Sequence, residues 1–191
     1  GRNYLVYHKP KSNLKPQGSG WSWDDFSYYF ASEISPFPIY GNVLQGIGDS
    51  NDPSFSPDGF ETHPASDSLA VNLKRARFEN SFYFNPRKWN LKDTLYQPFI
   101  TSDDLFVQLL RDELNIPVRL SSQSKRTEWE LLYTRQEEKL YKALLQDSDN
   151  GIAESILVMI SQKRFDEMNI ERTIDTLKFQ WRSWLPDPLE W

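Results

Sequence analysis

The sequence has no cysteine, only two histidines and no apolar run that approaches twenty residues. Without cysteine the chain forms no disulfide and has no thiol for catalysis, although this does not fix its compartment. With only His8 and His63, a histidine zinc site or a Ser-His-Asp triad is hard to build, and we expect both on the surface. No segment is long and apolar enough to span a membrane.

An excess of basic residues is also lacking. The 22 lysines and arginines are outnumbered by 27 aspartates and glutamates, which gives a formal net charge of −5. This balance argues against a protein that binds nucleic acid or an anionic membrane, because either would need a basic face. The 191 residues include 12 Phe, 9 Tyr and 7 Trp, enough for a real core in one large or two small domains.

A polar corner at residues 146–151 separates two segments with helical periodicity. Leucines at 140, 144 and 145 precede it, and Ile152, Ile156 and Ile160 follow at intervals of four. Ser148-Asp149-Asn150 within the corner has two interpretations that both stay open. It can cap the second helix, or it can present a hydroxyl and an amide to a cleft, as the Ser-Asp-Asn element of penicillin-interactive serine enzymes does.

The run from 21 to 42 is rich in aromatic residues, beginning Trp21-Ser22-Trp23-Asp24-Asp25-Phe26 and continuing through Tyr28, Tyr29 and Phe30. We favour an aromatic corner that closes one end of a core. The alternative is a recognition surface on which Asp24 or Asp25 pairs with a cationic group of a ligand.

The remaining periodicity predicts an α+β fold. Strands are expected at 3–8, 68–73, 81–84 and 118–120, and helices after Thr101 or Ser102, at 135–146, at 151–162 and, with Asn169 as N-cap, at 170–184. Residues 46–68 are loop-like, and the basic stretch 74–77 is interpreted as a solvated turn or strand face. The polar connector 121–126 is the best domain boundary and divides the chain into 1–120 and 126–191.

Two Ser-x-x-Lys matches, at 12–15 and 122–125, raise the question of a serine nucleophile. Such a motif needs the lysine one helical turn from the serine. Pro10 and Pro16 bracket the first match and the second lies in a polar connector, so we expect neither to be a nucleophile. The acidic run 49–52 lacks the glycine and glutamate of a calcium loop. No metal or cofactor is implied.

Several of these segments together resemble class C low-molecular-mass penicillin-binding proteins. The resemblance covers most of the chain in the family's order: 21–25 with Tyr28-Tyr29 and 33–35, then 98–100 with the helix after it, then 132–134 with the Ser148-Asp149-Asn150 corner, and last 184–187 with Trp191. A nucleophilic Ser-x-x-Lys upstream and a Lys-Thr-Gly downstream, which the family has, do not occur at those places.

The resemblance implies an internal fragment of a periplasmic or extracytoplasmic serine-type D-alanyl-D-alanine carboxypeptidase or endopeptidase. Its first part would belong to an accessory domain and its second to the helical half of the catalytic domain. Ser148 would relay a proton to the leaving amine and Asn150 would hold the substrate amide. Asp25, with Trp21 nearby, would meet the free amine of a peptidoglycan stem peptide. β-Lactams would acylate the intact enzyme.

The resemblance also implies that this chain alone is inactive, because the serine nucleophile and its lysine are missing. The start at Gly1-Arg2-Asn3 also suggests an excised piece, whose apolar surface could support a homo-oligomer. The alternative of another class is a non-catalytic module that binds peptidoglycan or a protein through the surface from Trp21 to Phe37. In that case Ser148 and Asn150 are only a helix cap.

Overall fold

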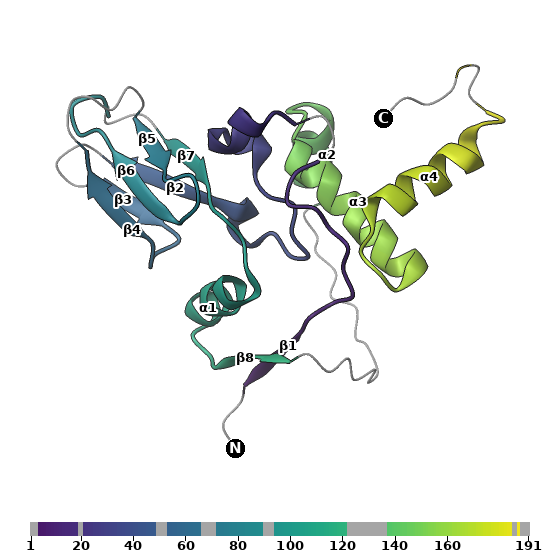
Figure 1. The fold of residues 1–191 in the computed structure, drawn as a ribbon, viewed down its shortest axis with the longest axis horizontal. Coiled ribbons are helices and arrows are strands. Elements are labelled where there is room, and N and C mark those ends of the chain that lie inside the picture. Colours follow the sequence, from purple (N-terminus) through teal and green to yellow (C-terminus); the bar gives the residue numbers. More distant parts are fainter. Residues whose placement is uncertain are drawn as a thin grey trace.

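The computed structural model describes residues 4–18, 21–48, 53–65, 72–89, 94–121, 137–184 and 187. Within these ranges the fold is α+β, as expected, with three small sheets and four α-helices. The two three-stranded sheets lie at one end of the molecule and helices α2, α3 and α4 at the other, while α1 packs beside the β1–β8 pair (Figure 1). In the part of the chain that is described, no helix has both the length and the apolar character needed to cross a membrane.

The strands form one parallel pair and two three-stranded sheets. The pair joins β1 (Leu5–His8) to β8 (Val118–Ser121). The first sheet is antiparallel, with the order β3 (Pro53–Ser56), β2 (Val43–Gly48), β7 (Leu95–Pro98). The second is mixed, with the order β4 (Glu61–Pro64), β6 (Ser81–Phe84), β5 (Leu73–Arg75).

The core lies against these two sheets. In β6 the buried side chains Phe82 and Phe84 alternate with the half-buried Ser81 and the exposed Tyr83, as a strand with one solvated face requires. The other members of the core cluster are Leu44, Leu73, Trp89, Phe99 and Leu109. Gly46 permits the close packing of Trp89, because a Cβ at this position would lie 2.7 Å from the indole ring.

The prediction that 46–68 is a loop was wrong. The segment contains the end of β2 and all of β3 and β4. The side chains of β3 and β4 are half-buried or exposed, so their composition resembles that of a loop, and backbone pairing to β2 and β6 defines them instead. Of the strand expected at 68–73, Leu73 begins β5, whereas residues 66–71 lie outside the described residues, as does the acidic run 49–52.

The prediction that residues 74–77 form a solvated turn or strand face was wrong for Arg75. Its side chain is buried, with 4% exposed. Its Nε donates to the carbonyl oxygen of Pro98 at 2.8 Å, and Nη1 donates to that of Ala76 at 2.8 Å. The guanidinium therefore satisfies backbone acceptors that a short strand and its turn leave unpaired.

Three short 3₁₀ helices and α1 precede the helical end. The 3₁₀ helices are η1 (Trp23–Ser27), η2 (Tyr29–Ala31) and η3 (Ile39–Asn42). Helix α1 (Asp103–Leu114) begins at the predicted N-cap, where the Ser102 hydroxyl accepts from the Leu105 N–H at 3.1 Å. It ends at Asn115, whose φ of 51° is left-handed. The expected N-cap of α1 is thus confirmed.

The three later helices are also confirmed. They are α2 (Glu137–Leu145), α3 (Asn150–Phe165) and α4 (Ile170–Trp181). Asn169 caps α4 as predicted, since its Oδ1 accepts from the Arg172 N–H at 3.0 Å. The predicted end of α4 at 184 was three residues too long, because the regular helix ends at Trp181.

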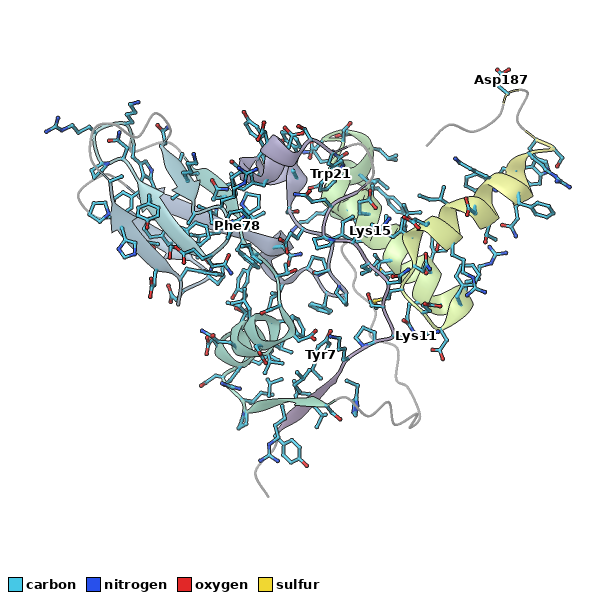
Figure 2. All side chains as sticks on the ribbon, viewed as in Figure 1. Tyr7, Lys11, Lys15, Trp21, Phe78 and Asp187 are labelled. Atoms are coloured by element: carbon cyan, nitrogen blue, oxygen red, sulfur yellow. The ribbon has the colours of Figure 1, made fainter. Side chains whose placement is uncertain are left out.

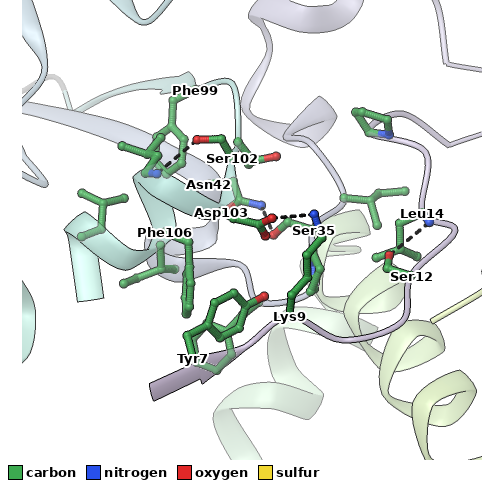
Figure 3. Close-up of a pocket in the computed structure, with 18 residues that line it drawn as sticks. Tyr7, Lys9, Ser12, Leu14, Ser35, Asn42, Phe99, Ser102, Asp103 and Phe106 are labelled. Atoms are coloured by element: carbon green, nitrogen blue, oxygen red, sulfur yellow. Dashed lines mark hydrogen bonds and ion pairs between the residues drawn. The ribbon is translucent and has the colours of Figure 1, made fainter. Parts of the chain in front are cut away.

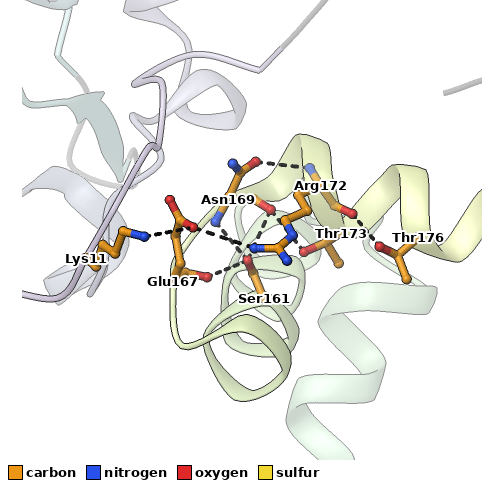
Figure 4. A network of polar contacts seen from close by, with 7 residues as sticks. All are labelled: Lys11, Ser161, Glu167, Asn169, Arg172, Thr173 and Thr176. Carbon is orange, nitrogen blue, oxygen red and sulfur yellow. Dashed lines mark hydrogen bonds and ion pairs between the residues drawn. The ribbon is translucent and has the colours of Figure 1, made fainter.

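A polar network fixes the turn between α3 and α4 (Figure 4). The buried Ser161 hydroxyl accepts from the Asn169 N–H at 2.8 Å and lies 2.7 Å from the Glu167 carbonyl oxygen. The Glu167 carboxylate accepts from Lys11 Nζ at 3.3 Å. Backbone bonds between residues 11–13 and Met168 strengthen this contact. The N-terminal segment is therefore attached to the helical end as well as to β8.

Candidate functional site

A cavity of about 480 Å³ lies where the aromatic run meets the corner between α2 and α3. Trp21 comes from the segment before η1, and Ser148 and Asn150 come from the corner. The described residues that line the cavity are Trp21, Tyr29, Phe30, Ser32–Ser35, Pro38, Tyr40, Gly41, Val43, Tyr96, Asp147–Ile152, Glu154 and Ser155. Packing of α3 against η2 therefore brings together two motifs that are far apart in sequence.

Different residues of the corner cap α3 and face the cavity. Asp149 is the N-cap of α3, and its Oδ1 accepts from the Ile152 N–H at 3.0 Å. Ser148 and Asn150 are exposed beside it, and neither side chain makes a hydrogen bond within the described part of the chain. Ser148 has a φ of 53°, a left-handed conformation that a non-glycine residue rarely adopts. Strain at such a position is a reason to look for function there.

Glu154 supplies a carboxylate to the cavity that the sequence reasoning missed. It is half-buried on α3 and makes no hydrogen bond or ion pair within the described residues. Burial raises the pKa of its carboxyl above the ordinary value of 4.5. A helical signal was available, because Glu154 lies four residues after Asn150 and thus on the same face of α3.

Both Trp21 and Glu154 lie close to Gly18. A Cβ at Gly18 would lie 3.4 Å from the Trp21 indole and 3.5 Å from Glu154 Oε1. The indole and the carboxylate therefore both border this glycine. An aromatic face and a nearby carboxylate are the groups that recognise an organic cation.

The central residues of the aromatic run are exposed. The prediction that the run closes one end of the core was therefore wrong for these residues. Tyr28 is 56% exposed and Tyr29 is 63% exposed. Phe30 stacks on Tyr28 with ring centroids 5.3 Å apart, and the Tyr29 and Tyr96 centroids lie 6.4 Å apart. Ala31 alone is buried in η2. The rings thus form one wall of the cavity and continue onto the exposed surface.

Asp25 stabilises the start of η1. Its Oδ2 accepts from the Ser22 N–H at 3.2 Å and so caps η1. Asp25 is not among the residues that line this cavity, whereas Trp21 is. A substrate contact for Asp25 therefore stays a prediction. Glu33, which does line the cavity, is held by Thr101, whose N–H and hydroxyl both donate to Glu33 Oε2 at 2.7 Å.

The first Ser-x-x-Lys match is not helical, in agreement with the prediction of a loop. Ser12 pairs through its backbone with Met168, and Lys15 Nζ lies 2.6 Å from Glu171 Oε1. No lysine, arginine or histidine is among the described residues that line the cavity. The second match at 122–125, and residues 132–134 and 185–186 of the family resemblance, lie outside the described residues. The described part of the cavity thus has hydroxyls, an amide and carboxylates but no basic side chain to activate a serine nucleophile.

A second cavity, of about 330 Å³, lies between β1, the 34–39 segment and α1 (Figure 3). Its charges are paired internally, with Lys9 Nζ 2.6 Å from Asp103 Oδ2. Burial, together with the Asp103 charge, raises the pKa of Tyr7 to about 12. This cavity lies between packed elements of the fold, and its lysine and aspartate are paired with each other. Across the described residues, no cluster of acidic or histidine side chains is arranged to hold a metal ion.

The chain is similar in structure to a penicillin binding protein. No protein-family model matches the sequence, and no curated protein matches it. The solved structure of penicillin binding protein 4 from Haemophilus influenzae superposes with a TM-score of 0.54 at 16% sequence identity. The match covers 91% of this chain but 46% of that protein, so the chain spans about half of its length. The fold is therefore similar to that of part of this penicillin binding protein.

Proposed function

We propose that the chain is part of a serine-type D-alanyl-D-alanine carboxypeptidase or endopeptidase that cleaves peptidoglycan stem peptides outside the cytoplasm. The observation that carries the proposal is the shared cavity of Trp21, Ser148 and Asn150. The sequence resemblance names these residues independently of their position in space. The structural similarity to penicillin binding protein 4 supports the same fold over most of the chain.

In this proposal the chain forms one wall of an acyl-transfer site. A serine from outside this sequence attacks the penultimate D-alanine carbonyl, D-alanine leaves, and water releases the acyl-enzyme. The Ser148 hydroxyl relays the proton to the leaving amine, and the Asn150 amide holds the substrate amide. Their exposure beside a cap made by Asp149 supports this division of roles, because neither is needed to complete α3.

The experiment compares the isolated chain with the protein encoded by its complete reading frame. D-alanine release from a peptide ending in D-Ala-D-Ala is measured for both. We expect release by the longer protein only. Ser148→Ala and Asn150→Ala in the longer protein should each lower kcat by about 10²–10⁴-fold, the usual loss for a proton-transfer group or an orienting amide. Glu138→Gln, on the exposed face of α2 and not among the residues that line the cavity, is the matched control. D-alanine release that is unchanged by both Ser148→Ala and Asn150→Ala contradicts the proposal.

A second candidate function rests on the exposed rings of the run from Trp21 to Phe37. In addition to Tyr28 and Tyr29, Phe37 is 56% exposed. Such a surface suits a non-catalytic module that binds peptidoglycan or a protein. Pull-down with purified peptidoglycan distinguishes this function from the peptidase. A non-catalytic module should still bind peptidoglycan after Ser148→Ala and Asn150→Ala but should lose binding after Tyr29→Ala.

A further inference from the structure

The cavity that contains Trp21, Ser148 and Asn150 carries charge of one sign. Every charged side chain among its described lining residues is a carboxylate, from Glu33, Asp147, Asp149 and Glu154. A cavity with this lining attracts a cation and repels an anion. The inference drawn from it goes beyond the peptidase proposal and does not rest on it, because it concerns the binding of an ion and not acyl transfer.

Glu154 is the carboxylate that remains for such a cation. Glu33 interacts with the charge of Arg75, and Asp149 caps α3. Asp147 is exposed, so water screens its charge. Glu154 is half-buried and makes no hydrogen bond or ion pair within the described residues. Its charge is therefore neither paired nor fully screened.

Trp21 brings an indole ring close to this carboxylate. A Cβ at Gly18 would lie 3.4 Å from Trp21 Nε1 and 3.5 Å from Glu154 Oε1, so both groups border one small space. Figure 2 labels Trp21 between the sheets and the helical end of the molecule. Among aromatic side chains, tryptophan attracts a cation most strongly. The indole and the carboxylate thus supply two attractions for the same ion.

Further aromatic rings line the cavity from η2, η3 and β7, where they belong to Tyr29, Phe30, Tyr40 and Tyr96. The Tyr29 and Phe30 rings meet edge to face, with centroids 5.9 Å apart and an interplanar angle of 80°. The Tyr29 and Tyr96 rings are inclined at 52° with centroids 6.4 Å apart. Rings inclined to one another form a concave corner, which can contact a compact ion on more than one side, as in aromatic cages.

The hydroxyl groups of two of these tyrosines already have partners. Tyr40 donates to the Glu113 carboxylate, which raises the pKa of Tyr40 to about 12 and keeps its phenol neutral. The Tyr96 hydroxyl accepts from Gln45 Nε2 at 3.5 Å. These tyrosines therefore offer ring faces to a ligand, and ring faces suit a cation whose charge is covered by methyl groups.

We propose that this cavity binds a small quaternary ammonium ion of the choline type. The ion lies between the Glu154 carboxylate and the Trp21 indole, and its methyl groups contact the rings of Tyr29 and Tyr96. The carboxylate supplies attraction between opposite charges, and the rings replace the water that the methyl groups lose.

The test is an NMR titration of the full 191-residue chain with choline and with neutral 3,3-dimethylbutan-1-ol, in which carbon replaces the nitrogen. Choline should bind in the millimolar range and shift the signal of the Trp21 indole N–H. The neutral alcohol should bind about tenfold more weakly. Equal affinity for both compounds, or shifts confined to other parts of the chain, overturns the proposal.

Ethanolamine tests whether the methyl groups matter, because it keeps the positive charge and lacks them. It should bind at least about threefold more weakly than choline. Tighter binding of ethanolamine would mean that the cavity takes a free amine, and the quaternary ammonium proposal would then be wrong. D-alanine release by the longer protein is measured separately, so failure of either proposal is recognised without the other.

Substitutions test the two kinds of contact. Glu154→Gln removes the charge, and Tyr29→Leu combined with Tyr96→Leu removes two ring faces while it keeps apolar side chains. Each change should lower choline affinity by about tenfold. The controls are Glu138→Gln and Tyr141→Leu on α2, which are exposed and do not line the cavity, and each should have less than about a twofold effect.

The controls also decide between this site and general attraction by an acidic protein. If Glu138→Gln weakens choline binding as much as Glu154→Gln does, the net charge of −5 explains the binding and the proposal is wrong. Binding that is unchanged by the substitution of Tyr29 and Tyr96 would exclude the rings as part of the site.

Discussion

The Asp149 carboxylate accepts a hydrogen bond from the Ile152 N–H at 3.0 Å and so caps α3. Asp149 is the middle residue of the Ser-Asp-Asn corner. The two flanking residues, Ser148 and Asn150, are exposed at the cavity and free of this structural task. Capping and site formation therefore coexist in three consecutive residues.

The cap predicts a stability effect at Asp149. Asp149→Ala removes the acceptor for the Ile152 N–H and should lower the free energy of unfolding by about 0.5–2 kcal/mol. Urea unfolding followed by circular dichroism measures the change. Asp147→Ala, two residues earlier and exposed, is the control and should stay within about 0.5 kcal/mol of the parent chain. Equal losses at both positions would argue against a cap at Asp149.

The left-handed φ of 53° at Ser148 predicts that a suitable substitution there does not lower the free energy of unfolding. Glycine accepts this conformation without the clash that costs another residue about 1–2 kcal/mol. Its greater freedom in the unfolded chain offsets about 0.5–1 kcal/mol of that gain. Ser148→Gly should therefore leave the free energy of unfolding unchanged or raise it by about 1 kcal/mol. Thermal unfolding checks this expectation.

Ser148→Ala keeps the left-handed strain and is the matched variant for that experiment. We expect it to unfold like the parent chain. A Ser148→Ala chain that is clearly less stable than the parent chain would mean that the hydroxyl holds the corner together. Ser148 would then be a structural residue.

Glu154 predicts a pH dependence. Because burial raises its folded-state pKa, the folded chain binds the Glu154 proton more tightly than the unfolded chain does. Stability from this group is thus highest below the unfolded pKa and falls as pH rises through the interval up to the folded pKa. Glu154→Gln removes this fall, so its advantage over the parent chain should grow as pH rises through and above the ordinary carboxyl pKa of 4.5.

Urea unfolding at a series of pH values measures this difference. Glu138→Gln on the exposed face of α2 removes a solvated carboxylate and serves as the control. An advantage of Glu154→Gln that is the same at every pH would contradict a desolvated carboxyl in the cavity wall. A ligand with a cationic group should also lose affinity in Glu154→Gln.

Gly46 predicts a steric effect in the core. A methyl group there would lie 2.7 Å from the Trp89 ring, well inside contact distance. Gly46→Ala should therefore lower the free energy of unfolding by about 1–3 kcal/mol. At Gly18 the same methyl group would make ordinary contacts of 3.4 and 3.5 Å, so Gly18→Ala is a matched control. Similar stabilities of the two variants would mean that Trp89 does not occupy this position.

The sequence predicted the elements whose signals are local. Ser102 and Asn169 indicated helix starts, and strict alternation predicted β6. The short edge strands β3 and β4 were missed because backbone pairing, which depends on distant residues, defines them. The burial of Arg75 was missed for the same reason, since its acceptor on Pro98 belongs to another strand.

The candidate site was predictable only in part. Trp21, Ser148 and Asn150 were named from the sequence, and the structure places them on one cavity. Glu33 and Glu154 were not named as site residues. The spacing of Asn150 and Glu154 on one face of α3 could have indicated Glu154, whereas no local pattern indicated Glu33. The division of the chain near residue 120 into two domains stays a prediction.

The central claim is that the cavity of Trp21, Ser148 and Asn150 is part of a penicillin-binding acyl-transfer site. Its most direct test is the rate of covalent labelling by a fluorescent penicillin. We predict that the isolated chain is not labelled and that the protein encoded by the complete reading frame is. Asn150→Ala in that protein should slow labelling by about 10²-fold or more. Labelling of the isolated chain, no labelling of the longer protein, or a rate unaffected by Asn150→Ala would contradict the account.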